Sequence, residues 1–133
     1  MSDPRLDVEL NIDGTTYILR YTNAALALAE KWTGKQVGEL AMMVGAGRFG
    51  FFDLTRLVAA GLEGARRKLR LAPQPWTVEK VEDLLEDAGS FEQVALPVVE
   101  AFNAALRKWF PDEFAEADAA EEEQDPSGTG TGS

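Results

Sequence analysis

The most constraining feature of the sequence lies near its start, where apolar and polar residues alternate on both sides of Asp13-Gly14. A period of two is typical of a strand that buries one face, and Asp-Gly favours a two-residue hairpin turn because both positions tolerate positive φ. With Ile12 opposite Thr15, the apolar residues share one face in further pairs: Leu10 with Tyr17, Val8 with Leu19, and Leu6 with Tyr21. The segment therefore predicts a β-hairpin, with Asp7 and Arg20 as an exposed charge pair on its other face.

An isolated hairpin is only marginally stable in water, so its apolar face must rest on other elements. Apolar stripes and capping residues predict helices at about residues 22–32, 37–44, 53–70, 77–89 and 90–110. We expect the N-terminal caps to be Thr22 or Asn23, then Asp53, Thr77, and Ser90 with Gln93 in a capping box. Pro97 should kink the last helix or delay its start. Trp32 and Leu57 are expected in the core.

Composition excludes several kinds of chemistry. The 133 residues include no cysteine and no histidine, which removes disulfides, thiolate metal sites, and the commonest general base and metal ligand. We therefore expect no enzyme activity, no cofactor and no metal. The first residues show no apolar signal-peptide region. No apolar run approaches the roughly 18–20 residues that span a bilayer, so we expect no membrane partner.

The net charge of −10 is concentrated near the end of the chain. Residues 112–125 carry eight acids and no base, and the remaining 15 acids and 13 bases give a net charge of only −2. A nearly neutral body provides no strong field for nucleic acid.

The hairpin and the helical stripes together predict an α+β, mainly α domain over residues 1–111, with the hairpin packed on a bundle of about four to five helices. Residues 112–133 are predicted to form a disordered acidic tail rich in Gly, Ser and Thr.

Three charged or glycine-rich segments are candidate sites. The segment 45–50 lacks the Gly-Lys-Ser/Thr ending of a phosphate-binding loop and follows no strand, which favours a connector between helices. The acids Glu82, Asp83, Glu86 and Asp87 are typical of a solvated helix face. The basic residues of 66–70 suit a helix C-terminus, and they could also meet phosphates, the acids of the next helix or the acidic tail.

Large aromatic residues are the candidate binding residues. Several fall in predicted loops or at helix ends, where a small domain cannot bury every ring: Phe49, Phe51, Phe52, Trp76, Trp109 and Phe110. Two interpretations stay open for them. They belong to the core, or an exposed subset forms a protein-binding patch.

The order of elements resembles a known family. The segments ELNIDGTTYILRYT, NAALALAEKWTGK and FFDLTRLVAAGLEGA follow one another, with a variable loop before the last. This order resembles the tail assembly chaperones of long-tailed bacteriophages, including related gene-transfer-agent tail proteins. In that family a hairpin with a glycine turn precedes a helix, and a later helix ends in a motif similar to Ala59-Ala60-Gly61-Leu62. The resemblance covers roughly residues 6–90.

The resemblance implies a non-catalytic chaperone that binds the tape measure protein during tail assembly in the host cell cytoplasm. Tail tube subunits are a second implied partner, and a homo-oligomer is a further one. The implied role is physically reasonable, because long amphipathic helices expose apolar stripes and aggregate unless covered. The alternative is a structural tail component retained in the mature virion. The composition of purified particles separates these two hypotheses.

Overall fold

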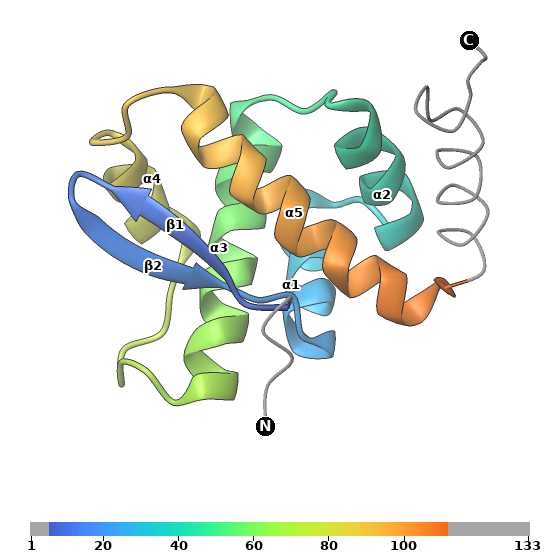
Figure 1. The fold of residues 1–133 in the computed structure, drawn as a ribbon, viewed down its shortest axis with the longest axis horizontal. Coiled ribbons are helices and arrows are strands. Elements are labelled where there is room, and N and C mark those ends of the chain that lie inside the picture. The colour runs from blue at the N-terminus through green and yellow to red at the C-terminus, as the bar shows by residue number, and fades with distance from the viewer. Residues whose placement is uncertain (1–5, 112–133) are drawn as a thin grey trace, which may run out of the picture.

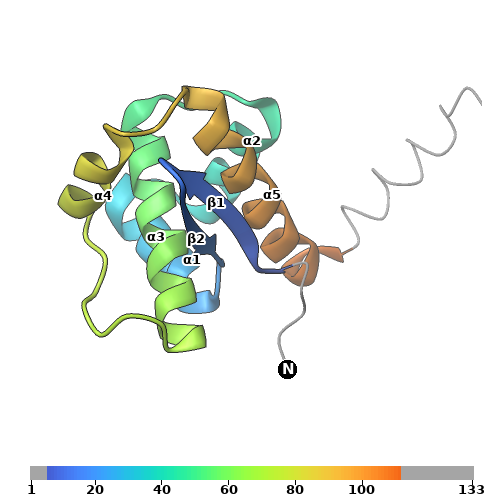
Figure 2. The ribbon, with the colours of Figure 1, turned by 60° about the vertical axis from the view of Figure 1, so that its left-hand side comes forward.

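The computed structural model describes residues 6–111. Two strands and five helices follow one another in this part of the chain: β1 (Val8–Ile12), β2 (Thr15–Leu19), α1 (Asn23–Thr33), α2 (Val37–Ala46), α3 (Phe51–Leu69), α4 (Val78–Leu85) and α5 (Phe91–Trp109). The hairpin lies between two long helices, with β2 along α3 and β1 along α5 (Figures 1 and 2). α1 packs on α3, and α2 packs on α5. This arrangement confirms the predicted fold class, while the predicted tail over 112–133 lies outside the described residues.

The hairpin has the predicted register. Val8 pairs with Leu19, Leu10 with Tyr17, and Ile12 with Thr15. Asp13 and Gly14 have φ of 50° and 80°, as the predicted turn requires. The paired residues end at Val8 and Leu19, so the expected pairing of Leu6 with Tyr21 is not part of the sheet. The apolar face of β1 is buried, which explains why this register is favoured over a one-residue slip.

The predicted charge pair forms, but it is not exposed. Arg20 Nη1 lies 2.8 Å from Asp7 Oδ1, and the Arg20 side chain is only 9% exposed. The backbone N–H of Arg20 also donates to the carbonyl oxygen of Gly61 on α3, at 3.0 Å. Because α3 covers the end of β2, Arg20 is buried at the junction of strand and helix, and Asp7 is only partly exposed.

Helix α3 is the centre of the core. Leu54, Leu57, Val58 and Leu62 are all buried on it, as its apolar stripe predicts. Tyr21 binds this helix through its hydroxyl, which donates to the Leu57 carbonyl oxygen at 2.5 Å. The predicted core position of Leu57 is therefore confirmed. Trp32 also packs against the core, as predicted, but its side chain is only half-buried.

Local capping signals set most helix starts. The hydroxyls of Thr22, Thr77 and Ser90 each accept a hydrogen bond from the backbone N–H three residues later, at 3.1, 3.2 and 3.1 Å. Gln93 does not complete the expected box with Ser90. Its amide instead accepts from the Gly89 N–H and donates to the Asn11 carbonyl oxygen of β1 at 2.8 Å. That second bond ties the start of α5 to the hairpin.

Other predicted boundaries are wrong. α3 begins at Phe51 with Gly50 as its N-cap, while Asp53 lies in the first turn and pairs with Lys35 at 3.2 Å. α2 continues to Ala46, and Gly47 with φ of 67° ends it. α4 ends at Leu85, earlier than expected.

Pro97 does not delay the start of α5, which runs through it. Proline lacks the N–H that would bond the Gln93 carbonyl. Gln93 is exposed, so water can reach that region of the helix.

Candidate protein-binding surfaces

Two phenylalanine rings at the start of α3 meet a third ring on α5. Gly47 and Gly50 flank the loop that turns the chain from α2 into α3. Phe49 is half-buried with its ring centroid 6.0 Å from that of Phe91 on α5. Phe51 is 74% exposed and meets the same Phe91 ring edge-on, at 5.3 Å. Phe91 is therefore the ring on which this aromatic group converges.

Phe52 is held outward by cations. The Arg56 guanidinium lies 3.5 Å from the centroid of the Phe52 ring, and Lys35 Nζ lies 5.9 Å from it. Arg56 Nη1 also donates to the Phe52 carbonyl oxygen at 3.1 Å. Cation–π contacts of this kind favour a fixed ring position, although Phe52 is 56% exposed.

These rings border an open groove of about 740 Å³ between the start of α3, the end of α4 and the start of α5. We call it the aromatic groove. Its apolar lining includes Phe51, Phe52, Leu54, Leu85, Phe91 and Val94. The α4 side carries three carboxylates, from Glu82, Asp83 and Glu86. The acids that the sequence assigns to a solvated face thus also form one rim of an apolar groove.

The last two predicted aromatic residues lie at the other end of α5. Trp109 is 51% exposed, and its Nε1–H donates to Asn23 Oδ1 of α1 at 3.1 Å. Together with Phe110 it borders a shallow apolar hollow of about 280 Å³, lined also by Leu26, Ala27 and Val37. The aromatic residues at the two ends of α5 therefore belong to separate surfaces.

Trp76 belongs to neither surface. It is half-buried, and its ring meets that of Tyr17 on β2 edge-on, with 5.9 Å between centroids. Its backbone N–H donates to Glu63 Oε1 at 2.8 Å. Trp76 thus closes the connector before α4 against the hairpin and α3.

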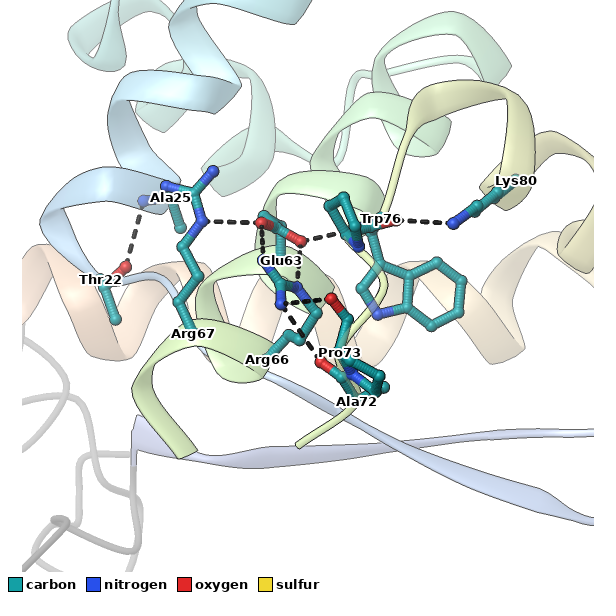
Figure 3. Close-up of polar contacts among 10 residues, drawn as sticks. Thr22, Ala25, Glu63, Arg66, Arg67, Ala72, Pro73, Trp76 and Lys80 are labelled. Carbon is teal, nitrogen blue, oxygen red and sulfur yellow. Dashed lines mark hydrogen bonds and ion pairs between the residues drawn. The ribbon is translucent and has the colours of Figure 1, made fainter. Parts of the chain in front are cut away.

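Glu63 is a buried carboxylate that sequence reasoning missed. Figure 3 shows the Arg66 and Arg67 side chains and the Trp76 N–H converging on it, with contacts of 2.7–2.8 Å. The hydrogen bonds from Arg66, and more weakly those from Trp76 and Arg67, lower its pKa to about 2 against the opposing effect of burial. Its position three and four residues before two arginines was the available signal.

The Glu63 cluster also fixes the chain after α3. Arg66 Nη1 donates to the Ala72 carbonyl oxygen at 3.2 Å, and Lys80 Nζ donates to that of Pro75 at 2.8 Å (Figure 3). Arg66 and Arg67 meet Glu63, an acid of their own helix, which was not among the partners expected for the basic segment. Lys68 and Arg70 remain exposed.

Three exposed apolar side chains were also missed, namely Met42, Leu71 and Leu96. Single exposed apolar residues are common on protein surfaces, so their type alone gives no signal. Across residues 6–111 no group of three or more acidic, histidine or cysteine side chains is arranged to hold a metal ion. Within the same residues no helix has the length and apolarity to cross a bilayer.

The fold and its surfaces define a small α+β protein that exposes aromatic rings at two places. Comparison with protein families identifies the family to which it belongs. The model of the family described as phage tail tube protein, GTA-gp10, matches residues 5–108. The match covers most of the chain, so the protein belongs to this family. No curated protein and no solved structure matches it.

The family match corrects the expected function. The resemblance led to the right context, that of phage tails and gene transfer agents. The main prediction of a chaperone that binds the tape measure protein is wrong, because the matching family is one of tail tube proteins, which are structural parts of a tail. The alternative of a structural tail component agrees with the match. A hairpin followed by amphipathic helices can serve either role, so the hydrophobic pattern did not separate them.

Proposed function

We propose that this protein is a structural component of a phage or gene-transfer-agent tail, assembled in the host cytoplasm and retained in the mature particle. The observation that carries the proposal is the match to the tail tube family over residues 5–108. That range spans both strands and reaches into the last turn of α5, so the similarity concerns the whole described fold.

The surfaces support a role in protein contacts. A structural subunit must bind neighbours through apolar surface that is exposed before assembly. The aromatic groove and the hollow at Trp109 both offer such surface. Aromatic residues are enriched at the centres of protein interfaces. A non-catalytic role also agrees with a sequence that lacks histidine and cysteine.

Particle composition tests the proposal. Particles from a strain that carries a tagged gene are purified by density gradient, and their proteins are quantified by mass spectrometry. We expect this protein at a fixed copy number relative to the other tail proteins. A strain without the gene should release particles that lack a complete tail. Complete tails that do not contain the protein would overturn the proposal.

A further inference from the structure

Helix α3 carries chemically opposite surfaces at its two ends. Its first turn borders the aromatic groove, and its last turn together with the C-cap Arg70 carries four bases within five residues. A helix of 19 residues separates these ends by about 28 Å. We propose that the groove of one copy receives the basic end of α3 from a second copy, an inference that rests on the proposed tail function.

The groove side combines apolar surface with unpaired acids. Glu82, Asp83 and Glu86 are exposed on the α4 rim. In the described part of the chain none of these three carboxylates belongs to an ion pair. The one base of the lining, Arg56, lies over the Phe52 ring and bonds the Phe52 carbonyl. The rim is therefore available to cations from outside the chain.

The other end of α3 has the complementary character. Arg67, Lys68, Arg70 and Leu71 are exposed there, and we call them the basic knob. Leu71 is an apolar side chain, 54% exposed, with cationic residues before it. An apolar tip among cations matches an apolar groove with an acidic rim.

The knob is preorganised by the Glu63 cluster. Arg70 adopts the left-handed conformation with φ of 53°, and the Leu71 N–H donates to the Arg66 carbonyl oxygen at 3.0 Å. Arg66 is itself held by Glu63 and bonds the Ala72 carbonyl. A segment already fixed in one conformation loses less entropy on binding.

Charge selects a head-to-tail contact between copies. Two grooves facing each other would oppose acid with acid, and two knobs would oppose base with base. A contact between the knob of one copy and the groove of another pairs opposite charges. It leaves a free knob and a free groove at the two ends of the pair. Such a heterologous contact repeats, either closing into a ring or continuing as a stack.

Two segments of the same chain are poor occupants of its own groove. The knob lies at the far end of α3, and the eight acids of residues 112–125 have the same charge as the groove rim. Those acids do complement the knob, which makes residues 112–133 the competing occupant of the knob.

Charge exchange tests the contact on the full-length protein. One variant carries Glu82→Lys, Asp83→Lys and Glu86→Lys; the other carries Arg67→Glu, Lys68→Glu and Arg70→Glu. Sedimentation velocity is run up to about 1 mM, the concentration that detects weak pairs. We expect salt-sensitive self-association of the wild type, at least tenfold weaker association of each variant alone, and restored association in a 1:1 mixture, since each variant then complements the other.

A matched control changes the same charge elsewhere. Glu9→Lys, Glu39→Lys and Glu100→Lys reverse three exposed acids away from the groove and should leave association unchanged. Restoration in the mixture also shows that both charge variants are folded. The inference is overturned if the wild type is monomeric or if the groove variant self-associates as strongly as the wild type. It is also overturned if the two charge variants do not associate when mixed. Association that appears only after residues 112–133 are deleted also overturns the inference. In that case those residues, and not a second copy, occupy the knob in the full-length protein.

The two proposals fail separately. The wild-type protein in purified particles supports the tail function whatever the charge variants do. If the groove variant enters particles as well as the wild type and self-associates normally, the knob-and-groove contact is wrong while the tail function stands. If the wild type is absent from complete particles, the tail function fails.

Discussion

Gly64 of α3 lies directly against the carbonyl oxygen of Arg20, at the point where the hairpin passes into α1. A Cβ at residue 64 would overlap that oxygen and would lie 2.7 Å from the Cβ of Ala25. Backbone and helix are both fixed here, so neither neighbour can move away cheaply. The absence of a side chain at this position lets α3 approach the hairpin and α1 together.

Replacing Gly64 with alanine should therefore destabilise the fold. We expect Gly64→Ala to lower the free energy of unfolding by about 1–3 kcal/mol, because an added methyl group forces a backbone shift. Gly45→Ala is the control, since Gly45 lies in α2 with no neighbour within 4 Å of an added Cβ. That change should stabilise by up to about 1 kcal/mol through helix propensity. Urea unfolding midpoints measure both, and equal shifts would contradict this account of the contact.

Glu63 makes the stability depend on pH in acid. Its carboxylate has an ordinary pKa of 4.5 and a pKa of about 2 in the folded chain. A lowered folded-state pKa means that the carboxylate contributes stability above pH 4.5. This contribution is lost as pH falls from there toward 2.

Glu63→Gln should remove that part of the pH dependence. Glutamine can still accept from the Trp76 N–H but cannot pair ionically with Arg66 and Arg67. Because both arginines can reach water, we expect a cost of about 1–3 kcal/mol at pH 7. The difference from wild type should shrink below pH 4.5. Thermal unfolding between pH 7 and 2.5 measures it, and a difference that stays constant over this range would argue against the assigned role.

Tyr21 offers a test of the buried hydroxyl. Burial raises the pKa of the Tyr21 phenol, and its hydroxyl donates to the Leu57 carbonyl oxygen. Tyr21→Phe should cost about 1–2 kcal/mol by removing this bond inside the core. Tyr17→Phe is matched to it, because Tyr17 is only half-buried and its change should stay within about 0.5 kcal/mol. If both variants unfold at the same denaturant concentration, the bond contributes nothing.

Features that depend on neighbouring residues in sequence could be predicted. The turn at Asp13-Gly14 and the register of Ile12 with Thr15 follow from a period of two and from tolerance of positive φ. The cap at Thr22 and the terminating Gly34 follow from local hydrogen bonding. In each case the interacting groups lie within a few residues, so the pattern contains the information.

Features that depend on packing between distant segments could not be predicted. Aspartate is a common N-cap residue, but the salt bridge of Asp53 with Lys35 forms only once the connector between α1 and α2 is placed against the start of α3. Phe91 meets Phe49 and Phe51 only because α5 crosses the start of α3. The six candidate aromatic residues shared a type and a place at element ends. Their division among two surfaces and the core is set by the tertiary structure.

The exposed rings at the groove should matter for assembly and little for folding. Phe51→Ser with Phe52→Ser removes exposed apolar surface, so we expect a change of at most about 1 kcal/mol in the free energy of unfolding. Incorporation into particles should fall about tenfold, which corresponds to a loss of about 1.4 kcal/mol in binding. Met42→Ser is the control, because Met42 is exposed on α2 away from the groove. Quantitative mass spectrometry of particles from complemented strains measures incorporation. Equal incorporation of the two variants would show that the groove rings are not part of a tail contact.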